Sequence, residues 1–210
     1  MKRIKIVMLG NSGTGKTCII NRLVYDKFVD NTQGTKSASM VSLNMDIPNT
    51  TNSIRCQVWD TAGQEEYHSL TSIYYKDANA AIVVFDITNA QSFEGAKKWI
   101  YDVTEERGTD IAIVMAGNKA DIVEKQDVDL MEVRDYADEN KIPFLIVSAK
   151  SNIGMKELMT ALADLLSKKK LIEVDKSAEP QLTDDCSADD KRTGARLTNL
   201  KKSNKSEKCC

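Results

Sequence analysis

The sequence of 210 residues contains no hydrophobic run long enough to cross a membrane as a helix. A spanning helix needs about 20 consecutive apolar residues, whereas the apolar run at residues 4–9 leads directly into a polar, glycine-containing turn. That run is also too short for a secretory signal, and Lys2 stands where an N-myristoylation signal requires glycine. We therefore expect no transmembrane segment, no secretory leader and no N-myristoyl group.

Cysteine and histidine residues at metal-ligand spacing are also missing. The five cysteines, at positions 18, 56, 186, 209 and 210, form no CxxC motif, and the chain has a single histidine, His68. These absences argue against a zinc site, and the odd number of thiols without a pairing pattern is typical of a reduced, cytosolic protein. We expect Cys18 and Cys56 to be small core residues and Cys186 to be an inert thiol.

The sequence has little net charge, and its charges are unevenly distributed. The formal net charge of −2 argues against nucleic acid as the main partner. Residues 173–190 contain seven acidic residues against one Lys, and residues 191–208 contain seven basic residues against one Glu. Segment 173–210 has too few apolar residues to form a core, so we expect a disordered tail after a single domain at 1–172.

What the sequence does contain is a series of short apolar runs separated by helical patterns. The runs at 4–9, 80–87, 111–116 and 142–147 are rich in aliphatic residues, as strands buried on both faces of a parallel sheet are. Apolar residues recur at helical spacing within 93–103, 130–137 and 155–166. Residues 38–47 and 53–59 fit two further strands that form the one antiparallel pair. The order predicts a doubly wound α/β fold with a six-stranded, mostly parallel sheet and helices on both faces.

A phosphate-binding loop follows the first predicted strand. Residues 10–17, GNSGTGKT, match the pattern GxxxxGK[ST] and stand between a strand and a helix, where this motif functions. Glycines let backbone N–H groups turn towards phosphate oxygens, and the helix N-terminus adds its dipole. We expect Lys16 to reach the β and γ phosphates and the Thr17 hydroxyl to bind Mg²⁺. The residues expected to contact the nucleotide here are Ser12, Gly13, Thr14, Gly15, Lys16, Thr17 and Cys18.

Two further segments predict which base is bound. Residues 117–121, GNKAD, follow the run at 111–116, and residues 148–150, SAK, follow the last predicted strand. The Asp121 carboxylate can accept from two neighbouring donors, which guanine presents at N1 and N2, whereas adenine presents an acceptor at N1. GTP is therefore favoured over ATP. The residues expected to hold the guanine are Asn118, Lys119, Asp121, Ser148, Ala149 and Lys150.

Residues 60–64, DTAGQ, supply the third part of the predicted site at the end of the strand expected at 53–59. Asp60 stands in a Walker-B type of position, where a carboxylate holds Mg²⁺ through water. Gly63 permits close backbone approach to a γ-phosphate, and Gln64 is placed to orient an attacking water. Together with Lys16, Gln64 is expected to carry catalysis.

These motifs make the sequence similar to the Ras-like small GTPases, and within that superfamily to the Rab family. The resemblance covers residues 4 to about 170 and includes all five nucleotide motifs. The segments that resemble Rab proteins are WDTAGQEEY (59–67), YYKDA (74–78), VVFDIT (83–88) and the terminal Cys-Cys. The segments that most resemble the early-endosomal Rab subgroup are YHSL (67–70), AAIVVFDIT (80–88), AKKW (96–99) and GNKAD (117–121).

The resemblance implies the small G-protein form of the P-loop NTPase fold and specific residue roles. Thr35 would bind Mg²⁺ only when the γ-phosphate is present. Phe28 would pack against the guanine, and Lys119 would stack along it. Asn118 would join the base loop to the phosphate loop, while the Ala149 N–H would meet the guanine O6.

The resemblance also implies a membrane and a set of partners. Cys209 and Cys210 would carry geranylgeranyl groups and hold the protein on the cytoplasmic face of endosomal membranes, with a cytosolic pool. The implied partners are an exchange factor, an activating protein that supplies an Arg finger, a Rab escort protein or GDP dissociation inhibitor, and trafficking effectors. The implied function is a GTP-hydrolysing switch that regulates vesicle transport and fusion.

Departures from the Rab pattern leave the effectors open. Met40, Trp59 and Tyr74 fall where the family has its effector-binding hydrophobic triad, but Lys36, Ser37, Met40 and Glu66 replace the residues that Rab proteins usually have there. One alternative is a prenylated scaffold that binds GTP with little or no hydrolysis. A P-loop ATPase or kinase is disfavoured by Asp121 and by the absence of a lid insertion.

Overall fold

The computed structural model describes residues 3–30, 34–35, 38–61 and 75–172. These residues form a six-stranded sheet in the order β2-β3-β1-β4-β5-β6. Within the described residues every neighbouring pair is parallel except β2 and β3, which are antiparallel. The predicted fold class is confirmed. The strands are β1 (Ile4–Leu9), β2 (Ser39–Asp46), β3 (Ser53–Asp60), β4 (Ala80–Asp86), β5 (Ala112–Asn118) and β6 (Phe144–Ile146).

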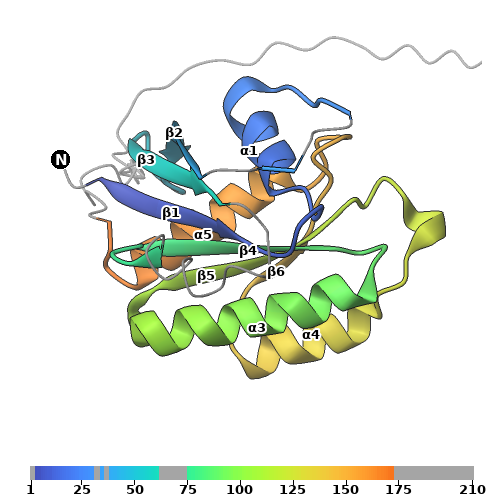
Figure 1. Cartoon of the computed structure of the whole chain (residues 1–210). Coiled ribbons are helices and arrows are strands. Elements are labelled where there is room, and N and C mark those ends of the chain that lie inside the picture. Colours follow the sequence, from blue (N-terminus) through green and yellow to red (C-terminus); the bar gives the residue numbers. More distant parts are fainter. Residues whose placement is uncertain (1–2, 31–33, 36–37, 62–74, 173–210) are drawn as a thin grey trace, which may run out of the picture. The chain divides into compact units, whose positions relative to one another are not determined.

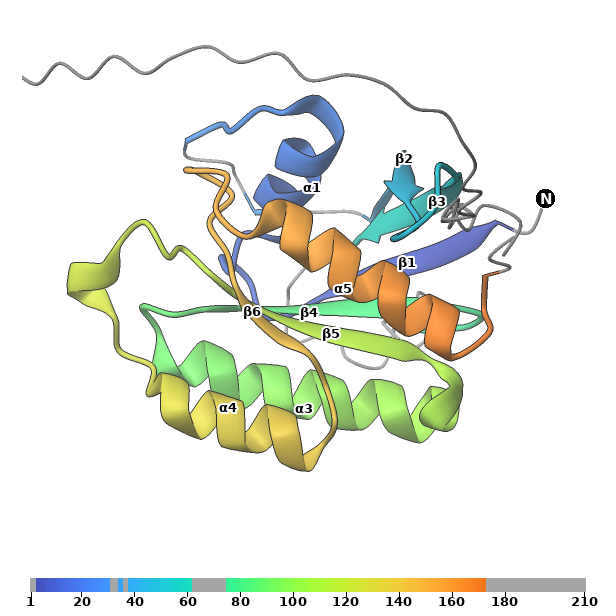
Figure 2. The same ribbon diagram turned by 180° about the vertical axis from the view of Figure 1, so that it is seen from behind.

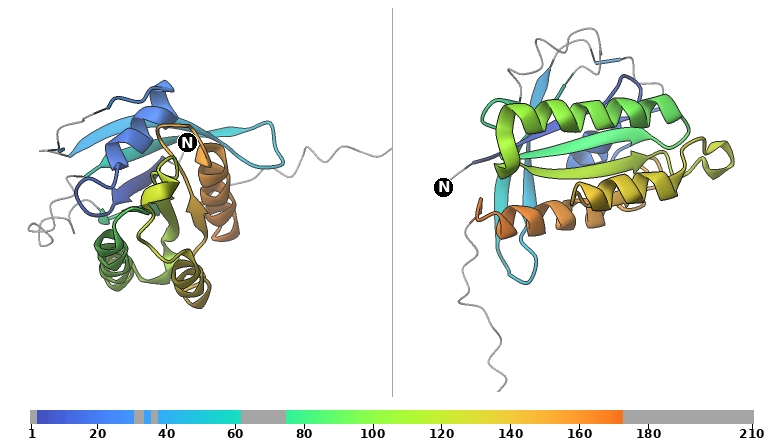
Figure 3. Two further views of the ribbon diagram at one scale, coloured as in Figure 1. Left: turned by 90° about the vertical axis from the view of Figure 1, so that its right-hand side faces the viewer. Right: turned by 90° about the horizontal axis from the view of Figure 1, so that it is seen from below.

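Helices cover both faces of the sheet (Figures 1 and 3). On one face α1 and α5 pack over β1, β4 and β5, and Figure 2 shows α5 crossing in front of these strands. On the other face α3 and α4 lie side by side. The described helices are α1 (Lys16–Tyr25), α3 (Ala90–Arg107), α4 (Leu130–Glu139) and α5 (Met155–Lys168), with short 3₁₀ helices η2 (Gly108–Asp110) and η3 (Val123–Lys125). None of them is long and apolar enough to cross a membrane.

The central strand β1 has apolar side chains on both of its faces. Ile4, Ile6 and Met8 belong to the core under α1 and α5, while Val7 and Leu9 belong to the core under α3 and α4. Successive side chains of a strand point to opposite faces, so a strand between two helical layers must be apolar at nearly every position. This requirement explains why the apolar runs of the sequence identified the buried strands.

Two strands differ from the prediction by two residues at one end, and the other boundaries agree within one residue. The run at 142–147 forms only the three-residue strand β6, because Ile142 hydrogen-bonds the C-terminal end of α4 and Pro143 has no N–H to donate. Strand β5 instead continues past the predicted 116 through Gly117 and Asn118. This extension brings Asn118 to the carboxyl end of the sheet.

Side-chain caps fix where two helices begin. The Asn89 side chain accepts from the Ser92 N–H at the start of α3, and the Asp129 side chain accepts from the Met131 N–H at the start of α4. Each cap satisfies a backbone donor that has no partner within its helix. The caps thereby help to fix the loop between β4 and α3 and the loop that leads into α4.

The two described cysteines differ in burial. Cys56 on β3 is fully buried, as expected of a small core residue, and burial raises the pKa of its thiol to about 12. Cys18 on α1 is only half-buried; it packs against the core and also borders the cavity described below. The other three cysteines lie outside the described residues.

Candidate nucleotide-binding site

A cavity of about 300 Å³ opens at the carboxyl ends of the parallel strands. Ligands of open α/β sheets bind at this edge, because the loops after the strands converge there. The cavity is lined by residues from segments 12–18, 28–30, 34–35, 118–122 and 149–150. The predicted residues that line it are Ser12, Gly13, Gly15, Lys16, Thr17, Cys18, Phe28, Thr35, Asn118, Lys119, Asp121, Ala149 and Lys150.

The phosphate loop runs from β1 into α1 and curls around the Lys16 side chain. Lys16 is 5% exposed, and its Nζ donates to the carbonyl oxygens of Gly10 at 2.7 Å and Asn11 at 2.9 Å. The ammonium group is therefore held at the mouth of the loop, beside the N-terminus of α1. A buried cation and a helix N-terminus together form an anion-binding site.

Gly15 lets the phosphate loop approach Asn118 closely. Its φ of +95° lies in the left-handed region, and a Cβ added there would lie 2.3 Å from Asn118 Nδ2. A side chain at this position would therefore strain the backbone and displace the Asn118 amide. The glycine of the motif serves contact with the base loop as well as approach to phosphate.

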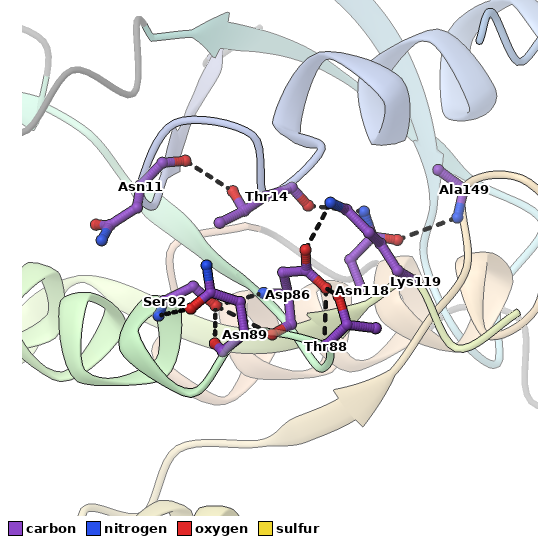
Figure 4. A network of polar contacts seen from close by, with 9 residues as sticks. All are labelled: Asn11, Thr14, Asp86, Thr88, Asn89, Ser92, Asn118, Lys119 and Ala149. Carbon is purple, nitrogen blue, oxygen red and sulfur yellow. Dashed lines mark hydrogen bonds and ion pairs between the residues drawn. The ribbon is translucent and has the colours of Figure 1, made fainter. Parts of the chain in front are cut away.

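Asn118 joins three loops of the site (Figure 4). Its Nδ2 donates to the Thr14 carbonyl at 2.8 Å, and its Oδ1 accepts from the Ala149 N–H at 3.2 Å. Asn118 itself is 3% exposed at the end of β5. The link to the phosphate loop is the one that the family resemblance implies, whereas the Ala149 N–H, expected to meet guanine O6, here bonds to Asn118.

Asp121 is oriented by a buried serine. Ser148 Oγ donates to Asp121 Oδ1 at 2.6 Å and accepts from the Ser151 N–H at 3.0 Å. Ser148 is fully buried and does not border the cavity, so it supports the carboxylate from behind. Thr14 is likewise buried away from the lining. Asp121 borders the cavity, whereas Ser148 lies behind it.

Lys119 is paired with Asp86 at the end of β4. Lys119 Nζ and Asp86 Oδ2 lie 2.5 Å apart, and Asp86 Oδ1 accepts from the N–H and hydroxyl of Thr88 (Figure 4). Because the ammonium is anchored, the aliphatic stem of Lys119 has a fixed course along the cavity wall. Asp86 is not among the residues predicted from the sequence. A carboxylate at the C-terminal end of a buried strand is the same signal that identified Asp60.

Three oxygen-bearing side chains meet beside the phosphate loop. Thr17 Oγ1 lies 2.7 Å from Asp60 Oδ2, to which it donates, and 2.8 Å from Thr35 Oγ1. Asp60 Oδ1 is buried, and nothing in the described part of the chain hydrogen-bonds to it. Burial raises the pKa of Asp60, opposed by the hydrogen bond from Thr17 and the charge of Lys16. Hard oxygen ligands with one unsatisfied buried carboxylate oxygen fit a magnesium ion.

The model of the Ras family matches residues 5–168, which is most of the chain. The chain belongs to the Ras family. Ras-family proteins are small GTPases that bind GTP and GDP, typically with Mg²⁺, and switch state on hydrolysis. Their partners include exchange factors, activating proteins and effectors. The match spans all the segments that line the cavity.

The described side chains of this Ras-family site are placed for the tasks predicted from the sequence. Lys16 would meet the terminal phosphates and Asp121 the base, and Thr17, Thr35 and Asp60 bring oxygens together where Mg²⁺ would fit. Mg²⁺ bound there would supply positive charge to the nucleotide phosphates. Thr35 lies in a segment separate from the phosphate loop, and its Oγ1 is 2.8 Å from Thr17 Oγ1. This contact could therefore form when a γ-phosphate is bound and break when it is lost.

Some predicted residues lie outside the described part of the Ras-family chain. These are Gly63, Gln64, Glu66, Tyr74, Lys36, Ser37, Cys186, Cys209 and Cys210. Other residues that line or support the site are not among those predicted. Val29, Asp30, Gly34 and Ile122 border the cavity beside predicted residues, and Arg22 donates to the carbonyls of Ala149 at 2.8 Å and Lys150 at 3.1 Å.

The oxygen cluster gives a prediction for magnesium dependence. Asp60→Ala should raise the dissociation rate of GDP in millimolar Mg²⁺ by about tenfold, the typical effect of losing one contact to a charged group. The rates of the variant and the wild type should converge when EDTA removes Mg²⁺. Release of a fluorescent GDP analogue measures both rates. Asp46→Ala on the exposed side of β2 is the matched control, and an equal difference with and without EDTA would contradict the assignment.

Proposed function

We propose that this GTPase is a Rab-type switch that regulates vesicle trafficking at intracellular membranes. The observation that carries the proposal is the pair Cys209-Cys210 after the basic segment 191–208. The Rab-like segments at 59–67, 74–78 and 83–88 support it. The segments that resemble the early-endosomal subgroup favour endosomal transport and fusion as the process.

Membrane attachment follows from the chemistry of the tail. One lipid chain gives marginal membrane binding, whereas two chains hold a protein stably. Each basic residue near an anionic bilayer adds about 1 kcal/mol. Geranylgeranyl groups on Cys209 and Cys210, with the seven bases of 191–208, would therefore anchor the protein to the cytoplasmic leaflet. A Rab escort protein and a GDP dissociation inhibitor would shield the lipids and maintain a cytosolic pool.

The β2–β3 pair offers a surface for effectors. Met40 and Trp59 are directly opposite each other on these strands, and Met40 is 46% exposed. Lys5 Nζ lies 5.0 Å from the centre of the Trp59 ring. Exposed apolar side chains next to an aromatic ring are typical of binding surfaces. Because β2 begins four residues after Thr35 in the sequence, effectors would read this surface together with the nucleotide state.

Hydrolysis is expected to be slow without a partner. Residues 28–40 contain no Arg, so this segment supplies no arginine finger in cis. Such a finger is worth about 10³ to 10⁵ in rate. An activating protein would supply it in trans, and the lifetime of the GTP state would depend on that protein.

The attachment is tested by localising three tagged full-length chains in cells. Wild type and Cys186→Ser are expected on endosomal membranes, whereas Cys209→Ser/Cys210→Ser should be found in the soluble fraction. Mass spectrometry of the tail peptide should find two prenyl groups on the first two chains only. Cys186→Ser is the matched control because it removes a thiol from the same tail. Membrane association of the double variant equal to wild type would contradict the proposal.

A further inference from the structure

The side chain of Asn11, in the phosphate loop, packs against Gly95 and Trp99 of α3. Its Oδ1 accepts a hydrogen bond from Trp99 Nε1 at 3.0 Å, between residues 88 positions apart. A Cβ added to Gly95 would lie 2.3 to 2.5 Å from the Asn11 amide atoms. Gly95 and Trp99 are four residues apart, so they share one face of α3. Because Gly95 has no side chain, the Asn11 amide fits against the helix, and Trp99 supplies the hydrogen-bond donor.

The donor in this contact is held in place by the core. Trp99 is 1% exposed and belongs to the cluster that α3 forms with β1, β4 and β5. A buried indole in a close-packed core has little freedom to follow a moving partner. Asn11 is therefore tied to a fixed point on the helix layer.

The backbone of Asn11 helps to hold Lys16, together with the Gly10 carbonyl. The Asn11 carbonyl oxygen accepts from Lys16 Nζ at 2.9 Å and from Thr14 Oγ1 at 3.0 Å. The same residue thus bonds α3 through its side chain and two phosphate-loop side chains through its backbone (the Thr14 bond is drawn in Figure 4). A shift of Asn11 would move an acceptor of the ammonium group that meets the nucleotide phosphates.

We propose that Asn11 is a positioning residue that holds the phosphate loop to α3. Gly95 leaves the space for its amide, and Trp99 donates a hydrogen bond to it. Asn11 acts on the nucleotide through Lys16. The helix layer thereby helps to set how long a guanine nucleotide stays bound. This inference needs guanine-nucleotide binding only, and it is independent of the proposed Rab-type role.

The first test is Asn11→Ala in the full-length protein loaded with fluorescent GDP. Losing one hydrogen bond that holds the loop should raise the GDP dissociation rate by about threefold to tenfold. The exposed residue Asn44 on β2 supplies the matched control, and Asn44→Ala should leave the rate unchanged. Asn11→Asp keeps an acceptor for the indole and should restore a slower rate than Asn11→Ala.

Gly95→Ala is a second variant that separates positioning from stability. Alanine favours a helix over glycine, so helix propensity alone would stabilise α3. The added methyl group would nevertheless displace the Asn11 amide from its position against α3 and so raise the GDP dissociation rate. In the Asn11→Ala background there is no amide to displace, and Gly95→Ala should leave the rate unchanged and raise the melting temperature.

A spectroscopic signature completes the test. The chain has two Trp residues, so the indole N–H resonance of Trp99 can be assigned with Trp59→Phe. This resonance should shift in Asn11→Ala and in Gly95→Ala, and remain in place in Asn44→Ala. The proposal is overturned if both single variants keep the wild-type dissociation rate, or if the two effects multiply in the double variant.

Discussion

Asp121→Asn is expected to weaken the binding of GTP and GDP by about 10³-fold to 10⁴-fold, because a site built to accept two donors rejects a mismatched edge strongly. Ser148 Oγ donates to Asp121 Oδ1 at 2.6 Å, which fixes the orientation of the carboxylate. In the variant one oxygen becomes an amide N–H₂ group, which would face the N1 or N2 donors of guanine. Two donors that face each other both lack an acceptor, which costs binding free energy.

The same change should improve binding of xanthine nucleotides. Xanthine has a carbonyl oxygen at C2, where guanine has its amino group, so the new amide can donate to it. Competition of GTP and XTP against a fluorescent nucleotide measures the change. Asp135→Asn, an exposed carboxylate on α4, should not alter either affinity. Unchanged discrimination between GTP and XTP in Asp121→Asn would contradict the assignment of Asp121 to the base.

Asn118→Ala should raise the GDP dissociation rate by about 10²-fold to 10³-fold, since it leaves two backbone groups without their partner at a cost of about 1–3 kcal/mol each. These groups are the Thr14 carbonyl and the Ala149 N–H, which belong to the phosphate loop and to the loop after β6. Both loops line the cavity, so loosening either one opens a path for the nucleotide.

The physical basis of this prediction is that one amide bridges segments more than one hundred residues apart, since Asn118 and Thr14 are separated by 104 positions. Stopped-flow release of a fluorescent GDP analogue measures the rate, and thermal unfolding of the nucleotide-free protein measures the stability. Asn44→Ala should change neither. A dissociation rate within twofold or so of wild type in Asn118→Ala would rule out the bridging role.

Much of the fold and of the site could be predicted because the relevant signals are local. Each buried strand is a run of a few apolar residues, and the phosphate loop is a motif of eight consecutive residues, 10–17. The carboxyl ends of parallel strands meet at one edge of a sheet, so the segments after β1, β3, β5 and β6 had to converge. This reasoning places Lys16, Thr17, Asp60 and Asp121 without knowledge of distances.

Contacts between distant side chains could not be predicted in this way. The pairing of Lys119 with Asp86 and the hydrogen bond from Trp99 to Asn11 depend on side-chain directions at the ends of separate elements. No sequence period encodes them, and Asn11 reads only as a variable position of its motif. The short length of β6 depends on Ile142 bonding to α4, which is also a tertiary contact. Such contacts require the backbone arrangement first.

The proposed switch depends on hydrolysis, for which Gln64 is the predicted water-orienting residue. Gln64 lies outside the described residues, so its role stays a prediction. A scaffold that holds GTP without cleaving it would have the same cavity, the same Asn118 bridge and the same base specificity. Hydrolysis therefore separates the two interpretations, whereas nucleotide affinity does not.

Single-turnover phosphate release from the GTP-loaded full-length protein tests this account most directly. Wild type should release phosphate slowly, at about 10⁻⁴ to 10⁻³ per second in Mg²⁺ without a partner, as expected of a small GTPase that lacks a cis arginine finger. Gln64→Leu should hold GTP equally well but release phosphate at least about tenfold more slowly. No release from wild type, or equal release from both proteins, would contradict the account.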